Sequence, residues 1–131
     1  MYVDSGATET VIAQQMLSMM EIKDSPQSRR GVEYEVANGI KIPNLGQKQF
    51  TGYDEAGVER EVTAQVCDVN KALLSVSKMC RAGNKVVFGA PEGNYIEDLT
   101  TGERIWMIEE GGMYALKMWV RSDGKAAHEP F

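Results

Sequence analysis

Histidine and cysteine are both scarce in this chain of 131 residues, which has one histidine, His128, and two cysteines, Cys67 and Cys80. Neither cysteine has the spacing of a metal ligand, so these three residues cannot build a typical structural zinc site. The same scarcity argues against a catalytic pair of cysteine or serine with histidine. We therefore expect no metal site, and we expect any hydrolytic chemistry to depend on carboxylates.

Long apolar runs and an excess of positive charge are also missing. No run approaches the ~20 apolar residues needed to cross a bilayer, and no basic segment followed by an apolar one opens the chain as a secretion signal would. Asp and Glu total 19 against 14 Lys and Arg, which gives a net charge of −5. Because that charge repels phosphate backbones, we expect neither a nucleic-acid nor a membrane partner. The two thiols fit the reducing conditions of the cytoplasm.

The rest of the composition is that of a single compact domain, with 43% hydrophobic and 25% charged residues. Glycine is frequent, and the spacing of turn signals predicts many short strands. Residues 32–36 alternate in polarity, Asn38-Gly39 is a strong hairpin signal, and residues 40–42 form the return strand. A second hairpin is predicted from Gln47 to Val69, with its turn at residues 54–57.

Two short helices are predicted beside the strands. Ala13 to Glu21 is rich in good helix formers, whereas the polar stretch from Lys23 to Gly31 predicts an exposed loop. Ser75 can cap a second helix that Gly83 ends. After this helix, strands are expected in four segments: Lys85–Phe88, Asn94–Glu97, Glu103–Ile108 and Met113–Val120.

The segment with the most chemical content is residues 2–12, which reads YVDSGATETVI. An Asp-Ser-Gly triplet alone describes many turns, so one interpretation of Asp4-Ser5-Gly6 is a turn that ends a strand. The apolar residues before it and Thr10-Val11-Ile12 after it make the pattern more specific. The whole segment resembles the active-site segment of retropepsins, the retroviral-type aspartic proteases. In such enzymes two carboxylates that share one proton activate a water molecule.

Later segments extend the resemblance. Leu73-Leu74-Ser75, the predicted helix, Gly83 and the strand at residues 86–88 resemble the C-terminal segment of retropepsins. The sequences VANG at residues 36–39, NLG at 44–46 and LSVSKMC at 74–80 are similar to proteases of copia-type retrotransposons. The similarity continues to about residue 120.

The resemblance implies a mostly β fold: a retropepsin-like half-barrel with a flap hairpin and one or two short helices. This core would occupy residues 1–88, with a C-terminal β extension at 89–121 and a frayed tail at 122–131. Because Asp-Ser-Gly occurs once, the implied enzyme is a homodimeric aspartic endopeptidase with two Asp4 carboxylates at a twofold axis. Its substrate would be an extended peptide, such as a retroelement polyprotein. No cofactor is implied, and the location would be the cytoplasm or a virus-like particle.

The resemblance also assigns roles to individual residues. Asp4 would be catalytic, and Ser5 and Gly6 would form its scaffold. The residues expected to bind substrate are Ala7 and Thr8, the flap tip Ala37, Asn38 and Gly39, and the apolar pair Leu73 and Leu74. Two other interpretations stay open: a catalytically inactive dimerisation or peptide-binding module with the same fold, and a structural β domain in which the triplet is accidental.

The sequence departs from the retropepsin pattern in three places. Ser75 stands where retropepsins usually have glycine, and the flap has a single glycine, Gly39. Retropepsins usually place two or more strands before the catalytic Asp, whereas three residues precede Asp4. We therefore expect the tail strands at 94–108 and 113–120 to pair beside Tyr2-Val3, in this subunit or its partner. The alternative is a separate hairpin packed on the outside.

Two further predictions concern single residues. Asp68 has no Ser-Gly or Thr-Gly after it, so it is a poor candidate for a second catalytic Asp. Cys67 and Cys80 both lie in apolar patterns, which predicts that both thiols are buried.

Overall fold

A computed structural model describes residues 1–122 and 125–126 of the chain. It confirms a mostly β fold with two short helices, α1 at Pro26–Arg29 and α2 at Val76–Arg81. His128 lies outside the described residues. No helix in the described part of the chain is both long and apolar enough to cross a membrane.

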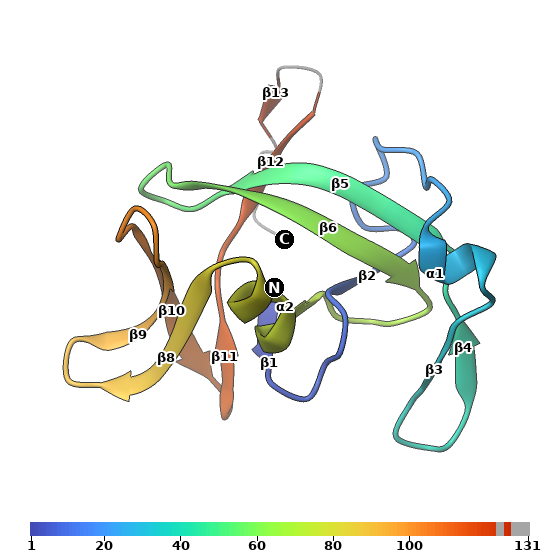
Figure 1. The fold of residues 1–131 in the computed structure, drawn as a ribbon, viewed down its shortest axis with the longest axis horizontal. Coiled ribbons are helices and arrows are strands. Elements are labelled where there is room, and N and C mark those ends of the chain that lie inside the picture. Colours follow the sequence, from blue (N-terminus) through green and yellow to red (C-terminus); the bar gives the residue numbers. More distant parts are fainter. Residues whose placement is uncertain (123–124, 127–131) are drawn as a thin grey trace.

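Most of the strands belong to one large, strongly curved sheet. The strands are β1 Tyr2–Asp4, β2 Val11–Ala13, β3 Glu33–Glu35, β4 Lys41–Pro43, β5 Gly46–Tyr53, β6 Glu59–Cys67, β7 Leu73–Ser75, β8 Asn84–Ala90, β9 Gly93–Asp98, β10 Arg104–Glu110, β11 Met113–Ala115, β12 Trp119–Ser122 and β13 Lys125–Ala126. Within the described residues the sheet order is β13-β12-β5-β6-β2-β7-β1-β11-β10-β9-β8, and β3 and β4 form a separate pair. Figure 1 shows the β5–β6 ribbon arching over α2 and β8, with the β3–β4 hairpin projecting at one side.

Both predicted hairpins are confirmed. Strands β3 and β4 pair with Tyr34 opposite Ile42, and Gly39 in the turn has a φ of 82°. Such a positive φ is what the Asn-Gly signal anticipates, because glycine adopts it without steric cost. Strands β5 and β6 pair along their whole length, from Gly46 opposite Val66 to Tyr53 opposite Glu59.

The helix predicted from Ala13 to Glu21 is wrong. After β2 the chain instead makes successive turns, and Leu17 adopts a left-handed φ of 53°. The carbonyls of Met16 and Leu17 accept hydrogen bonds from the buried Nζ of Lys48, at 2.9 and 3.0 Å. Because a distant lysine satisfies these carbonyls, the segment folds against β5 despite its helix-forming composition.

The segment predicted as an exposed loop, Lys23 to Gly31, contains α1. Its N-cap residue Ser25 is fully buried and forms a capping box with Ser28: each hydroxyl accepts from the backbone N–H of the other residue. Two serines and Pro26 at the first helical position thus specify one helical turn.

The tail strands lie close to their predicted positions, with one difference. The single strand expected at Met113–Val120 is two strands, β11 and β12, separated by residues 116–118. Leu116 and Met118 are both buried while Lys117 is exposed. Both side chains pack in the core, and between them the chain crosses from β11, which pairs with β10, to β12, which pairs with β5.

The pairing predicted beside the Asp4 strand is present. Strand β11 pairs antiparallel with β1, with Tyr2 opposite Ala115 and Val3 opposite Tyr114, and both strands belong to the same subunit. The frayed tail predicted from Ser122 is partly ordered, because Lys125–Ala126 pairs with β12 as β13. The rest of that predicted tail lies outside the described residues.

One buried hydrophobic cluster connects residues 1–88 with the extension. Its members are Met1, Val3, Ile12, Phe50, Ala64, Val66, Ala72, Leu74, Ile96, Ile105, Met107, Leu116, Met118 and Val120. Cys67 is buried as predicted, and burial raises the pKa of its thiol to about 11, so the thiol stays protonated at neutral pH. Cys80 is exposed, which corrects the prediction: α2 packs against β7 and β8, and Cys80 lies on a side of the helix that these strands leave exposed.

Candidate active site

The Asp4 carboxylate lies where β1 ends and a short loop to β2 begins. Strand β1 is flanked by β7 in parallel and by β11 in antiparallel orientation, and Asp4 stands opposite Ser75. The backbone N–H of Gly6 donates to Asp4 Oδ1 at 2.7 Å. A Cβ atom on Gly6 would lie 3.3 Å from that oxygen, so glycine permits this close approach. Asp4 is half-buried, while Ser5 and Gly6 are exposed.

Ser75 anchors the loop that follows Asp4. Its fully buried hydroxyl donates to the carbonyl of Ala7 at 2.7 Å and accepts from the backbone N–H of Lys78 at 3.2 Å, which caps α2. Its own backbone N–H donates to Thr10 Oγ1 at 3.1 Å. One side chain therefore fixes the Asp4 loop to both β7 and α2. The sequence predicts the cap, but it contains no signal for the contacts with Ala7 and Thr10.

Glu9 provides a second connection between this loop and the two helices. Its carboxylate lies 3.6 Å from Lys78 Nζ on α2 and accepts from Gln27 Nε2 on α1 at 3.3 Å. Sequence reasoning missed these contacts, because they join residues far apart in the chain.

The structure brings together several residues of the predicted site. Ala7 and Thr8 belong to the Asp4 loop, and Leu73 and Leu74 lie on β7 directly opposite Tyr2 and Val3. Leu74 is 5% exposed and belongs to the core cluster, whereas Leu73 is half-buried. In this subunit Leu73 is therefore the more accessible of the two leucines.

The predicted flap tip lies apart from these residues. Ala37, Asn38 and Gly39 are exposed at the end of the β3–β4 hairpin, where Asn38 Oδ1 accepts from the N–H of Ile40 at 3.1 Å. Figure 1 shows this tip well separated from the loop after β1.

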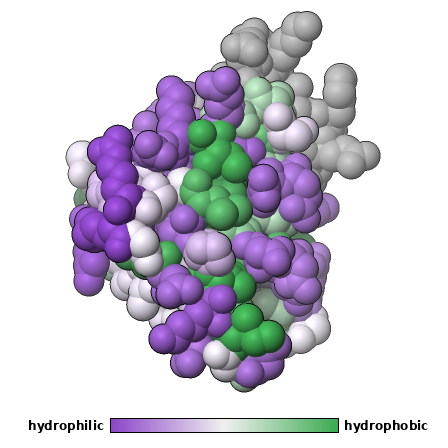
Figure 2. Space-filling model, turned by 90° about the vertical axis from the view of Figure 1, so that its right-hand side faces the viewer, coloured by the Kyte–Doolittle hydropathy of each residue, from purple (hydrophilic) through white to green (hydrophobic). Residues whose placement is uncertain are grey.

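Figure 2 views the side of the molecule that lies at the right of Figure 1, and it shows a band of hydrophobic residues flanked by hydrophilic ones. Ile40 is 59% exposed.

Asn44 fixes the base of the hairpin to the sheet. Its buried amide donates to Tyr34 Oη and Gln65 Oε1, each at 2.9 Å, and its Oδ1 accepts from the N–H of Gly46 at 2.8 Å. Burial raises the pKa of Tyr34 above its ordinary value. The hairpin is thus firmly held at its base, and its exposed tip has no comparable anchoring network among the interactions recorded for the described residues.

No group of three or more His, Cys, Asp or Glu residues in the described ranges is arranged to hold a metal ion. Comparisons with known proteins assign no identity to the chain: no family model matches it, and neither a curated protein nor a solved structure matches it significantly.

Proposed function

We propose that this chain is a retropepsin-like aspartic endopeptidase that acts as a homodimer, most similar to the proteases of copia-type retrotransposons. The observation that carries the proposal is the placement of Asp4-Ser5-Gly6 at the end of β1, beside β7, in a loop that Ser75 anchors. A catalytic carboxylate needs a rigid base of this kind, because its position relative to water and substrate sets the rate.

The reaction would need the Asp4 carboxylates of two subunits. Two carboxylates at close range share one proton, because both cannot stay ionised. The ionised member would accept a proton from water as the water attacks the peptide carbonyl, and the protonated member would donate to the carbonyl oxygen. Ser5 and Gly6 are exposed in the subunit, so the loop is accessible to its counterpart.

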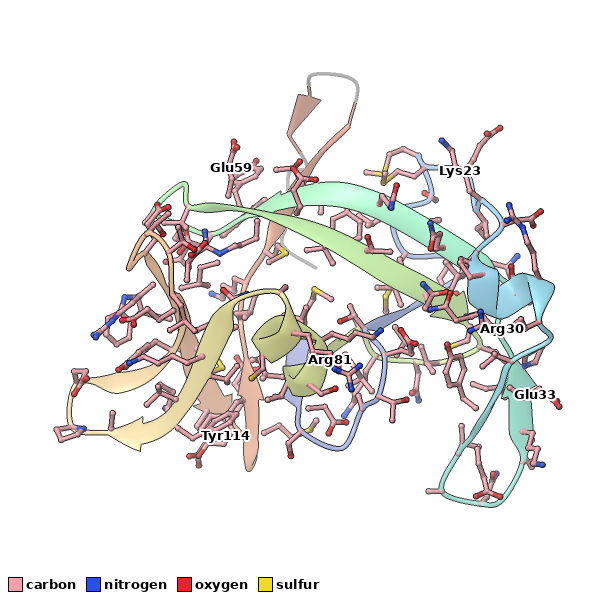
Figure 3. The ribbon with its side chains drawn as sticks, in the orientation of Figure 1. Lys23, Arg30, Glu33, Glu59, Arg81 and Tyr114 are labelled. Carbon is pink, nitrogen blue, oxygen red and sulfur yellow. The ribbon has the colours of Figure 1, made fainter. Side chains whose placement is uncertain are left out.

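Apolar side chains near β1 support self-association. Phe88 on β8 is 41% exposed and packs against Tyr114 with ring centroids 4.7 Å apart. Tyr114 lies on β11, the strand next to β1, and Figure 3 shows it at the same edge of the molecule as the foot of β8. A partner that covers these rings would approach the Asp4 loop from the same side.

The substrate would be an extended peptide held by main-chain hydrogen bonds, as in β-strand addition. Ala7, Thr8 and Leu73 would contact it from the floor of the site. The flap tips, residues 37–39, would cover it in the assembled dimer. The substrate class follows from the resemblance to retroelement proteases, whose substrates are polyproteins.

Replacement of one carboxylate by an amide tests the proposal. We expect Asp4→Asn to reduce cleavage of an unfolded protein, such as reduced and alkylated casein, by at least ~10²-fold, because an amide cannot accept the proton of water. Asp68→Asn is the matched control, since Asp68 is exposed and outside the site. We expect cleavage at acidic to neutral pH, where the pair retains one proton, and we expect inhibition by pepstatin.

Two results would contradict the proposed peptidase activity. Cleavage by Asp4→Asn within a few-fold of the parent would remove Asp4 from the mechanism. A dimer in sedimentation experiments that cleaves no peptide would instead support an inactive dimerisation or peptide-binding module.

A further inference from the structure

A cavity of about 420 Å³ lies between the β5–β6 ribbon, α2 and the β9–β10 strands, and Asp4 is not among the residues that line it. Its volume falls in the range of sites that bind small ligands. The apolar part of its wall includes Val62, Leu74, Met79, Ile105 and Met118. The cavity therefore opens onto side chains of the hydrophobic core.

Three of the residues that line the cavity each have a buried polar atom with no hydrogen-bond partner among the described residues. These atoms are Gln27 Oε1, Arg60 Nε and Asn84 Oδ1. Buried groups of this kind are rare, because each one costs free energy when it loses water without gaining a partner.

Part of the β6 edge beside the cavity also has no partner strand in the described part of the chain. Strand β6 pairs with β5 along its length, but on its other side β2 covers only Gln65 to Cys67. The N–H of Gln65 points to that second side, toward the carbonyl of Thr10. Because backbone groups alternate along a strand, those of Glu61 and Thr63 point the same way, where no described strand pairs with them. Both residues line the cavity.

From the apolar cavity and the unpaired stretch of β6 we infer that together they form a binding site for an extended, apolar peptide segment. The segment adds to β6 at Glu61 and Thr63 as a further strand. Its alternate side chains enter the cavity, because side chains two apart share one face of a strand.

The charges around the cavity favour an uncharged segment. Lys78 is paired with Glu9, and Arg60 lies 4.0 Å from Glu103, so the basic groups at the rim are already neutralised. A strongly charged ligand would find no unpaired partner among these four groups and would lose its hydration. Asp4 does not line this cavity, whereas Glu9 and Thr10 of the loop that follows Asp4 do, so peptide binding is measured separately from cleavage.

The test uses a fluorescein-labelled, capped pentapeptide of alternating threonine and valine, with binding measured by fluorescence anisotropy to the full chain. Two further versions of the peptide, Thr-Val-Thr-Val-Thr, carry N-methyl groups either on both valine amides or on the amides of the central and the last threonine. In a strand these two sets of N–H groups face opposite edges. We expect one methylated peptide to bind at least about tenfold more weakly and the other to bind like the parent. Equal binding of both, or no binding of the parent at millimolar concentration, would overturn the inference.

Protein variants locate the site. Thr63→Pro removes the N–H on the free edge of β6, and Thr63→Val retains it, so we expect the proline variant alone to lose binding. If Thr63→Pro does not fold, the methylated peptides still decide whether the peptide binds as a strand along one of its edges. Displacement of the peptide by dodecanoate, together with equal binding of both methylated peptides, would identify a lipid cavity and contradict the inference. Asp4→Asn should bind the peptide like the parent, which separates this test from that of catalysis.

Discussion

The candidate site depends at the scale of single residues on Ser75, which contacts Ala7, Thr10 and Lys78 at once. The sequence predicts Ser75 as a helix cap and as a departure from the glycine of retropepsins, but it gives no sign of the contact with Ala7. Glycine could form none of the side-chain contacts, so the serine is what attaches the Asp4 loop to α2 in this chain. The residues of the triplet itself were predictable because they are contiguous, whereas Glu9 and Lys78 meet only after folding.

We expect Ser75→Ala to lower the free energy of unfolding by about 1–3 kcal/mol, because it removes a helix cap and leaves the partly buried carbonyl of Ala7 without its side-chain donor. Urea denaturation measures the effect. Ser18→Ala, in an exposed turn, is the control and should change stability by less than about 0.5 kcal/mol. Equal stability of the two variants would show that Ser75 does not anchor the loop.

At the scale of elements, strands with local turn signals were predictable and elements set by distant contacts were not. The β3–β4 hairpin was predictable because Asn38-Gly39 specifies its turn, and the N-terminus of α2 because Ser75 is a good cap. The segment from Ala13 to Glu21 was not, because Lys48, which is far away in sequence, satisfies its carbonyls. Periodicity likewise could not show that Leu116 and Met118 divide one predicted strand into two.

Lys48 offers a direct test of that explanation. Its side chain is 3% exposed, and burial lowers the pKa of its amine. We expect Lys48→Met to lower the free energy of unfolding by about 1–3 kcal/mol, because the carbonyl of Met16 loses the donor Lys48 and that of Leu17 retains only the N–H of Met20. Lys41→Met, at an exposed position on β4, is the control for urea denaturation. A variant at Lys48 as stable as this control would show that the lysine does not hold the turns.

At the scale of the whole molecule, the extension after Phe88 shares one sheet and one core with the preceding residues. Strand β11 covers β1, and β12 extends the β5–β6 ribbon. The sequence predicted a tail strand beside Tyr2-Val3, but the complete strand order depends on contacts across the chain that no local pattern encodes. The parallel pairing of β1 with β7 is one such contact.

Truncation after Phe88 tests whether the extension completes the core. We expect the fragment 1–88 to be unfolded by circular dichroism, because the lost contacts exceed a typical stability of about 5–15 kcal/mol. In the full chain, Leu116→Ala should cost about 2–5 kcal/mol, and Lys117→Ala, at an exposed position, less than about 0.5 kcal/mol. A folded, dimeric 1–88 fragment would show that the extension is an accessory.

The central claim is that each subunit contributes one carboxylate to a shared site, and subunit mixing tests it most directly. The parent chain is incubated with an equal amount of Asp4→Asn until subunits have exchanged, and cleavage of an unfolded protein is then measured. Random exchange places half of the parent subunits in mixed dimers with a single carboxylate, so total activity should fall to about half. Addition of Asp68→Asn instead should not lower activity. Activity unchanged by Asp4→Asn under demonstrated exchange would contradict the shared site.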